Sequence, residues 1–453
     1  MFRTTWLHGL ALVVCLCAVA PALAAPREIK VKEEVLGEVT VLAPAEEPQI
    51  FAALLSDKDG FTPAYKAAAE KLVAGGAAVL LVDTAFFIDA LDKSDEENCH
   101  YAFGDIEDAA RVAQRQLGMK TWRWPVLLGL GDLGGAMAYI SISQTPDNTA
   151  AGAVSTGFTT RIASHLVMCE GAVGKSAGKD LWDYTAPKTI PARWSLIGAT
   201  PPPAAIQPFL DTKGAASVVT PGDAETITDA AIKATLEIGA PPAEELGDLP
   251  LVELPTDGPP VGLVIFLSGD GGWRDIDKTI GEILQKEGVA VVGVDSLRYF
   301  WSTKEPEAIA SDLSRIVAYY TKLWGAKRVG IIGYSLGADV VPFAWQKFSP
   351  QVQKQINLLA LLGLEPTADF QISVAGWLGV SSASDVDLKP YLPTLPMQKT
   401  MCFYGSEETA DGETACVDPI MAKATIVQRP GGHHFDGDYE PVARMILDRL
   451  KQP

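Results

Sequence analysis

Two pairs of short segments recur at one fixed spacing, which limits this chain to a fold built from two similar halves. Residues 55–61 read LSDKDGF and residues 267–273 read LSGDGGW. Residues 82–84 (VDT) and 294–296 (VDS) are related by the same shift of 212 positions. The two matches need no gap between them, so the halves are expected to share their first strands and turns.

A third pair of similar segments lies at a different spacing. Residues 127–134 read LLGLGDLG and residues 331–337 read IIGYSLG. When the final glycines are aligned, Asp132 stands opposite Ser335, and a short deletion separates the halves before this point. The first half therefore lacks a serine where the second half has one.

Each half reads as strands that alternate with helices. In the second half, residues 261–267, 289–294 and 329–332 are apolar runs of the length of a buried strand. Between them, residues 276–286 and 308–323 carry apolar side chains at helical spacing. Such alternation predicts the α/β class, with a parallel sheet covered by helices on both faces.

The segment between the halves is typical of loops. Residues 201–203 are all proline, and the acidic stretch 239–260 is rich in proline and glycine, so both interrupt regular structure. We predict a first domain at 25–245, a linker at 246–257 and a second domain at 258–453. A length of 453 residues suits two such domains.

The first 24 residues are typical of an export signal. Arg3 precedes an apolar run at 7–20, and residues 22–24 (ALA) form a small-x-small cleavage pattern. An uncleaved membrane anchor is the alternative, although the apolar run is short for a membrane span. We expect the mature chain to begin after about Ala24 and to act outside the cytoplasm.

Four cysteines remain once the export signal is excluded. An even number in an oxidising compartment predicts two disulfides, one in each half: Cys99–Cys169 and Cys402–Cys416. The cysteine spacings do not resemble a zinc site and histidine is scarce, so no metal is predicted.

The chain is strongly acidic, with a formal net charge of −19. This charge argues against nucleic acid as a partner, because phosphates need basic side chains. It favours a cationic ligand, or simply keeps the protein dispersed in solution.

The segment 333–337 (GYSLG) has the pattern of a nucleophile elbow. It follows the apolar run 329–332 and precedes residues that can open a helix. In such an elbow Ser335 is the nucleophile, and the amide of Leu336 points to the place where an oxyanion forms. The alternative is a purely structural glycine turn.

A serine nucleophile needs a base and an acid. His433 and His434 lie near the C-terminus in the sequence GGHHF, and the chain order serine, acid, histidine suits them. We predict His433 as the base, with His434 as the alternative; a surface loop or a metal pair is the competing interpretation. The acid is expected in the turn after the apolar strand at 399–404, and the candidates in order of preference are Glu408, Glu407 and Asp411.

The second oxyanion donor is expected in the glycine-dense turn at 268–273. Gly269 or Asp270 would provide the amide. A phosphate-binding loop is the competing interpretation, but the turn lacks the Lys-Ser/Thr ending of a nucleotide-binding loop. No histidine of the first half corresponds to His433, so that half is expected to keep the fold without the catalysis.

Three motifs together resemble the VirJ/AcvB family of bacterial periplasmic, virulence-associated α/β-hydrolases. They are residues 267–275 (LSGDGGWRD), 333–340 (GYSLGADV) and 431–439 (GGHHFDGDY). The second half resembles the VirJ domain and the whole chain resembles the longer AcvB form. The resemblance implies two α/β-hydrolase-like domains in tandem, the first degenerate and the second catalytic.

The resemblance also implies an activity and a place. Relatives of this kind hydrolyse the aminoacyl ester of lysyl- or alanyl-phosphatidylglycerol at the outer face of the inner membrane, without a cofactor, and are associated with type IV secretion. The implied location is the periplasm and the implied partners are an aminoacylated phospholipid and a secretion apparatus or secreted protein. The alternatives are a non-catalytic binding protein or chaperone that supports secretion, and a peptidase or general lipase.

Overall fold

The structure is a computed structural model that describes residues 26–452 apart from 95–97, 147, 170, 172, 242–245, 247–248 and 373–385. The expected export signal, residues 1–24, lies outside the described residues. Among the residues that are described, no helix combines the length and the apolar character that crossing a membrane requires.

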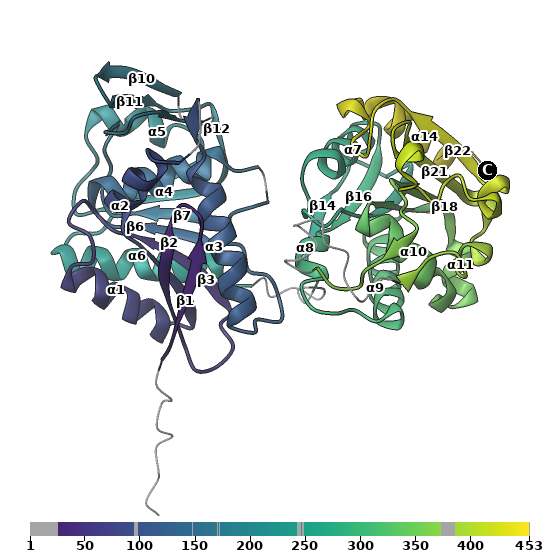
Figure 1. Cartoon of the computed structure of the whole chain (residues 1–453), viewed down its shortest axis with the longest axis horizontal. Coiled ribbons are helices and arrows are strands. Elements are labelled where there is room, and N and C mark those ends of the chain that lie inside the picture. The colour runs from purple at the N-terminus through teal and green to yellow at the C-terminus, as the bar shows by residue number, and fades with distance from the viewer. Residues whose placement is uncertain are drawn as a thin grey trace, which may run out of the picture.

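The first domain is a mostly parallel sheet between two layers of helices (Figure 1). In the described part of the chain this sheet has eight strands in the order β1-β2-β4-β3-β6-β7-β12-β13. Their bounds are β1 Arg27–Glu33, β2 Gly37–Ala43, β3 Ile50–Leu55, β4 Ala77–Val82, β6 Val126–Gly129, β7 Gly152–Ser155, β12 Thr189–Gly198 and β13 Lys213–Val219. Strands β1 and β2 run antiparallel to their neighbours and the others are parallel.

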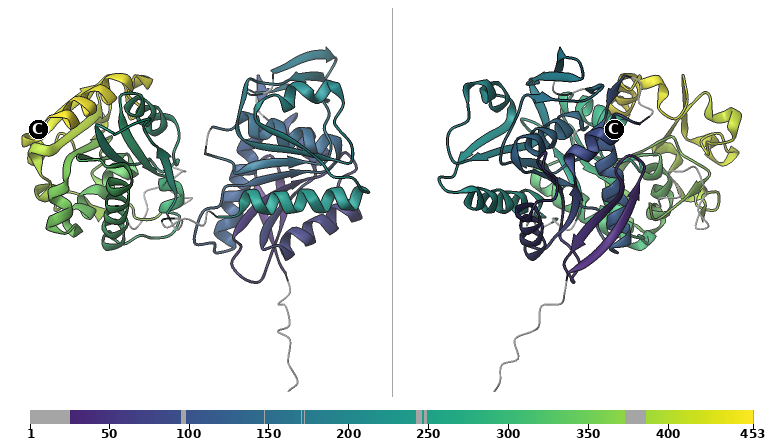
Figure 2. Two further views of the ribbon diagram at one scale, coloured as in Figure 1. Left: turned by 180° about the vertical axis from the view of Figure 1, so that it is seen from behind. Right: turned by 60° about the vertical axis from the view of Figure 1, so that its left-hand side comes forward.

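Two pairs of helices cover this sheet. The helices α1 and α6 lie side by side on one face, and α3 and α4 pack together on the other (Figure 2). The helix bounds are α1 Pro63–Ala74, α2 Thr84–Leu91, α3 Ala102–Gln116, α4 Gly131–Gln144, α5 Gln207–Leu210 and α6 Ala224–Gly239. Short strands form two small additional sheets: β5 Cys99–His100 with β9 Val167–Met168, and β10 Val173–Gly178, β11 Leu181–Thr185 and β8 Arg161–Ile162.

The second domain repeats the same topology. Its sheet, counted over the described residues, has seven strands in the order β14-β16-β15-β17-β18-β21-β22, of which only β14 is antiparallel. Their bounds are β14 Leu251–Leu254, β15 Gly262–Leu267, β16 Val289–Val294, β17 Val329–Tyr334, β18 Ile356–Leu362, β21 Thr400–Gly405 and β22 Thr425–Arg429. Taken in order across the sheet, the strands from β14 to β22 correspond one by one to the strands from β2 to β13 of the first sheet. The predicted tandem of α/β-hydrolase-like folds is therefore confirmed.

Helices cover both faces of the second sheet as well. The helices α7 and α14 pack together on one face, and α9 and α10 pack together on the other. The central strands β15, β16 and β17 are buried at every position, which explains why they read as uninterrupted apolar runs. The bounds are α7 Asp275–Lys286, α8 Ser296–Tyr299, α9 Pro306–Trp324, α10 Leu336–Lys347, α11 Pro350–Gln355, α13 Glu408–Asp411, α14 Glu440–Lys451, and a small hairpin of β19 Thr367–Ala368 and β20 Val386–Asp387.

One predicted boundary needs correction. The proposed linker at 246–257 contains β14, which pairs with β16 and so belongs to the second sheet. Leu246 and Leu249 are buried in the hydrophobic core as well. The segment is polar and rich in proline around a strand of four residues, and such a short edge strand leaves little periodic signal in the sequence.

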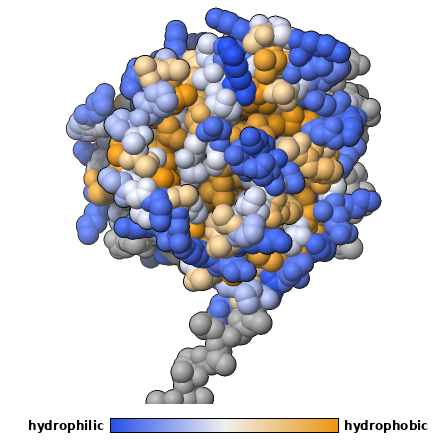
Figure 3. Space-filling model, turned by 90° about the vertical axis from the view of Figure 1, so that its left-hand side faces the viewer, coloured by the Kyte–Doolittle hydropathy of each residue, from blue (hydrophilic) through white to orange (hydrophobic). Residues whose placement is uncertain are grey.

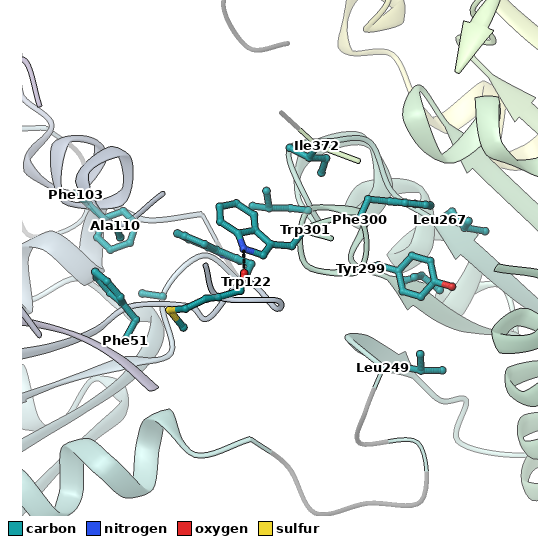
Figure 4. Close-up of a cluster of buried hydrophobic side chains, with 14 of the residues drawn as sticks. Phe51, Phe103, Ala110, Trp122, Leu249, Leu267, Tyr299, Phe300, Trp301 and Ile372 are labelled. Atoms are coloured by element: carbon teal, nitrogen blue, oxygen red, sulfur yellow. Dashed lines mark hydrogen bonds between the residues drawn. The ribbon is translucent and has the colours of Figure 1, made fainter. Parts of the chain in front are cut away.

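The two domains are joined by aromatic side chains. Trp301 of the second domain packs on Trp122 of the first, with ring centroids 5.0 Å apart, and its Nε1 donates to the carbonyl of Met119 at 2.9 Å (Figure 4). The Arg115 guanidinium lies 3.6 Å from the centroid of the Trp301 ring.

At the opposite end of the first domain, hydrophilic and apolar side chains are interspersed over the surface (Figure 3).

Candidate active site

Ser335 lies on a strained turn between β17 and α10. Its backbone has φ 52° and ψ −126°, a conformation that residues other than glycine rarely adopt. The flanking glycines allow this turn to form: a Cβ on Gly333 would lie 2.3 Å from the carbonyl oxygen of Gly337, and one on Gly337 would lie 2.3 Å from that of Leu267. Strain of this kind in a non-glycine residue is typical of functional sites.

His433 and Glu408 form a hydrogen-bonded pair. The Nδ1 atom of His433 lies 2.7 Å from Oε1 of Glu408, and the other carboxylate oxygen accepts the amide of Gly405 at the end of β21. Glu408 is only 2 % exposed, whereas Glu407 is exposed. The side chain of Asp411, the third candidate acid, lies outside the described residues. Of the two candidates whose side chains are described, Glu408 is the one with a hydrogen bond to His433.

Ser335 and His433 line the same pocket, which has a volume of about 370 Å³. The glycine-rich turn at 269–272 forms another wall, and a Cβ on Gly269 would lie 3.6 Å from the Cβ of Ser335. His434 also lines the pocket, and its Nδ1 lies 3.4 Å from the hydroxyl of Tyr334. The structure therefore brings together the serine, both histidines and the turn that the sequence singled out.

The charges around His433 favour its protonated form. Burial lowers the pKa of this imidazole, but the hydrogen bond to Glu408 and the negative charges of Glu408, Glu365 and Asp270 outweigh that effect, so the pKa is raised above its usual value. Glu365 is exposed by its accessible surface, but the protein groups around its carboxyl partly exclude water and raise its pKa. No sequence motif marks Glu365, which lies three residues beyond the end of β18, so only the structure shows that it is close to His433.

The amide of Leu336 opens α10, where the first backbone N–H groups of a helix have no partner within the helix. Gly269 and Asp270, the two candidates for the second donor, both line the pocket beside Ser335. Asp277 lines the same pocket, and burial raises the pKa of its carboxyl well above the usual value.

Both predicted disulfides, Cys99–Cys169 and Cys402–Cys416, are present. The second joins the buried strand β21 to a residue just beyond α13, so it closes the loop that carries Glu408. Among the described residues, no group of three or more histidine, cysteine, aspartate or glutamate side chains is placed to hold a metal ion.

The first domain has a modified version of the same turn, and the alignment of Asp132 with Ser335 is wrong. The residue at the elbow is Gly131, whose φ of 67° corresponds to that of Ser335; Asp132 is an insertion directly after it. The carboxylate of Asp57 accepts the amide of Leu133 at 3.0 Å, and a Cβ on Gly131 would lie 2.3 Å from that carboxyl group. The elbow of the first domain thus has glycine in place of the nucleophile, and the Asp57 carboxylate occupies the place of the oxyanion.

Comparison with known proteins gives one family match. Residues 262–453 match the family model described as bacterial virulence protein (VirJ). No curated protein matches the chain. Several solved structures are distantly similar: MenH from S. aureus has 15% identity, covers 44% of this chain and 97% of that chain, and has a TM-score of 0.34.

Two further solved structures cover a similar share of the chain. Est1E from Butyrivibrio proteoclasticus has 15% identity, covers 45% of this chain and 93% of that chain, and has a TM-score of 0.32. The thioesterase domain from the curacin biosynthetic pathway has 14% identity, covers 44% of this chain and 94% of that chain, and has a TM-score of 0.30. The strand order described above establishes the α/β-hydrolase fold of the second domain, and residues 262–453 of this domain match the VirJ family model.

Proposed function

We propose that this protein is a periplasmic serine hydrolase that cleaves the aminoacyl ester of aminoacylated phosphatidylglycerol. The observation that carries the proposal is the 2.7 Å contact between His433 and Glu408, in a pocket that the strained Ser335 also lines. This set of residues is what ester hydrolysis through an acyl-enzyme requires.

The reaction runs in two halves. The Ser335 hydroxyl attacks the ester carbonyl while Nε2 of His433 takes its proton, and the amides of Leu336 and of Gly269 or Asp270 stabilise the oxyanion. The phosphatidylglycerol oxygen then leaves with the proton from His433, which leaves the amino acid esterified to Ser335. Water, deprotonated by His433, attacks this acyl-enzyme and releases the free amino acid and the serine hydroxyl.

The substrate class is supported by the family match and by the charge of the pocket. Carboxylates of Asp270 and Asp275 line the pocket, and Glu365 is near enough to affect the pKa of His433. A negative wall suits the ammonium group of an aminoacyl substrate. Two disulfides suit an oxidising compartment such as the periplasm.

The test is hydrolysis of defined lipids by the purified mature protein. Vesicles that contain lysyl- or alanyl-phosphatidylglycerol are expected to yield the free amino acid and intact phosphatidylglycerol, measured by mass spectrometry. Unmodified phosphatidylglycerol vesicles provide the control and should yield nothing. Release of fatty acids would indicate a lipase instead, and absence of any product in a protein that reacts with a fluorophosphonate probe would exclude this substrate.

The charges around His433 predict a pH dependence that can be tested separately. His433 must be neutral to act as base, so kcat/KM is expected to rise with pH through the raised pKa of His433. Glu365→Gln removes a negative charge that favours the imidazolium, so the pKa should fall and the acidic limb should move to lower pH. The measurement is the pH profile of kcat/KM on a neutral ester; an unmoved limb would contradict the role of Glu365.

A further inference from the structure

One basic side chain in the pocket comes from the other domain. Arg111, on α3 of the first domain, lines the pocket with Ser335 and His433. Its guanidinium lies 2.6 Å from Oε1 of Glu107, one turn earlier on the same helix. The same oxygen is 3.4 Å from the guanidinium of Arg274, which also lines the pocket and directly precedes α7.

The position of α3 relative to the pocket is fixed by contacts one turn further along. Arg115 donates to the carbonyls of Trp301 and Ile372 in the second domain. Its guanidinium also stacks on the Trp301 ring, and Trp301 in turn donates to the first domain (Figure 4). Residues four apart lie on the same side of a helix, so these contacts hold Arg111 beside the pocket.

Two guanidinium groups meet the carboxylate of Glu107 here, and the Asp108 carboxyl lies close enough to Arg111 for the guanidinium charge to oppose the rise in the Asp108 pKa. The three bridged side chains are largely buried: Glu107 is 9% exposed, Arg111 12% and Arg274 20%. Charges removed from water act on a ligand more strongly than exposed charges do. Arginine is also the side chain best suited to phosphate, because its planar group donates two parallel hydrogen bonds.

The pocket therefore has groups of both signs around Ser335. Asp270 and Asp275 provide carboxylates, and Arg111 and Arg274 provide guanidinium groups. The headgroup of an aminoacylated phosphatidylglycerol has the same character, with an ammonium on the acyl side of the ester and a phosphodiester on the alcohol side. A binding site for such a headgroup needs one region of each sign.

We propose that Arg111 and Arg274 form a subsite for the phosphodiester anion of the substrate, so that the degenerate first domain completes the binding site of the second. This inference rests on the proposed function for the identity of the substrate. Anion binding itself can be measured independently of that substrate.

The experiment uses the full mature chain, a neutral chromogenic ester and the soluble headgroup glycerophosphoglycerol as the competing anion. The headgroup is expected to inhibit ester hydrolysis competitively, and Arg111→Met is expected to raise its inhibition constant about tenfold. Arg111→Lys, which keeps the charge, should recover part of the affinity. Lys278→Met removes one positive charge from α7 at a residue that does not line the pocket, and should leave the inhibition constant unchanged.

A variant of Glu107 separates anion binding from a merely structural bridge between the domains. Glu107→Gln removes the negative charge between the two arginines, so a phosphate subsite should bind the headgroup more tightly. If the three residues only hold the domains together, Glu107→Gln and Arg111→Met should weaken inhibition alike, and that result would overturn the inference. So would a wild-type protein that the headgroup does not inhibit.

Failure of the proposed function gives a different pattern. If aminoacylated lipids are not hydrolysed but the headgroup still inhibits through Arg111, the anion subsite stands and the substrate is wrong. Calorimetric titration with glycerophosphoglycerol measures the same affinities without turnover. Thermal unfolding of each variant shows whether a loss of affinity reflects a loss of the fold.

Discussion

Ser335→Ala is expected to lower ester hydrolysis by about 10⁴-fold or more and to abolish reaction with a fluorophosphonate probe. Loss of the nucleophile in a serine hydrolase removes the covalent route and leaves only the contribution of binding and oxyanion stabilisation. The substitution removes only the hydroxyl oxygen and keeps the Cβ, so the folded structure should remain. Amino acid release from aminoacylated vesicles and labelling by the probe are the measurements.

A second substitution at the same position tests whether the turn is strained for function. Ser335 has a positive φ, which glycine adopts without cost, and strain of this kind is worth about 1 to 3 kcal/mol. Ser335→Gly is therefore expected to be as inactive as Ser335→Ala but more resistant to thermal unfolding. The first domain has glycine, Gly131, at the corresponding place.

Ser406→Ala provides the matched control. Ser406 is an exposed serine in the turn beside Glu408, and its replacement should leave labelling and hydrolysis intact. If the Ser335 variants still react with the probe, or if Ser406→Ala is the variant that loses reaction, the nucleophile has been assigned to the wrong residue.

The second-domain elbow could be predicted from the sequence because its signal is local. The glycines at 333 and 337 are needed for the close packing of strand, turn and helix, and their spacing around Ser335 is visible without the fold. The strands β15, β16 and β17 could be predicted from similar local signals, since they are buried at every position and read as apolar runs.

Other features depend on how distant segments meet, and no local pattern reports them. Arg111 is a charged residue on an amphipathic helix, and only the docking of the two domains places it beside Ser335. In the first domain an inserted residue, Asp132, follows the glycine that matches Ser335 by conformation, so sequence alone aligns the two elbows wrongly. The short strand β14 is recognised only by its pairing with β16, which is a tertiary contact, so sequence alone places it in the linker.

The first domain explains how an α/β-hydrolase turn can persist without catalysis. Its Leu133 amide corresponds to that of Leu336, and this amide donates a hydrogen bond to the Asp57 carboxylate at 3.0 Å. A fixed carboxylate there satisfies the donors that a substrate oxyanion would otherwise use. Together with the contribution of Arg111 to the other pocket, this arrangement favours a supporting role in substrate binding over a second, independent active site.

Glu408→Gln is expected to lower kcat by about 10² to 10⁴-fold, next only to the loss of Ser335. The carboxylate accepts the Nδ1 hydrogen of His433, which leaves Nε2 free to take the serine proton. A glutamine can instead offer its amide N–H to Nδ1, and the ring then carries its hydrogen on Nε2, where it cannot act as base. Loss of the buried negative charge also removes the main group that raises the pKa of His433.

Glu407→Gln is the matched control, since it makes the same chemical change one residue away. The Glu407 side chain is exposed, whereas Glu408 is 2 % exposed and bonded to His433, so the Glu407 variant should keep nearly full activity. Kinetics on a neutral ester and thermal unfolding of both variants separate a catalytic loss from a structural one. If Glu407→Gln were the inactive variant and Glu408→Gln the active one, the acid of the triad would be Glu407, and the hydrogen bond to His433 would have no part in catalysis.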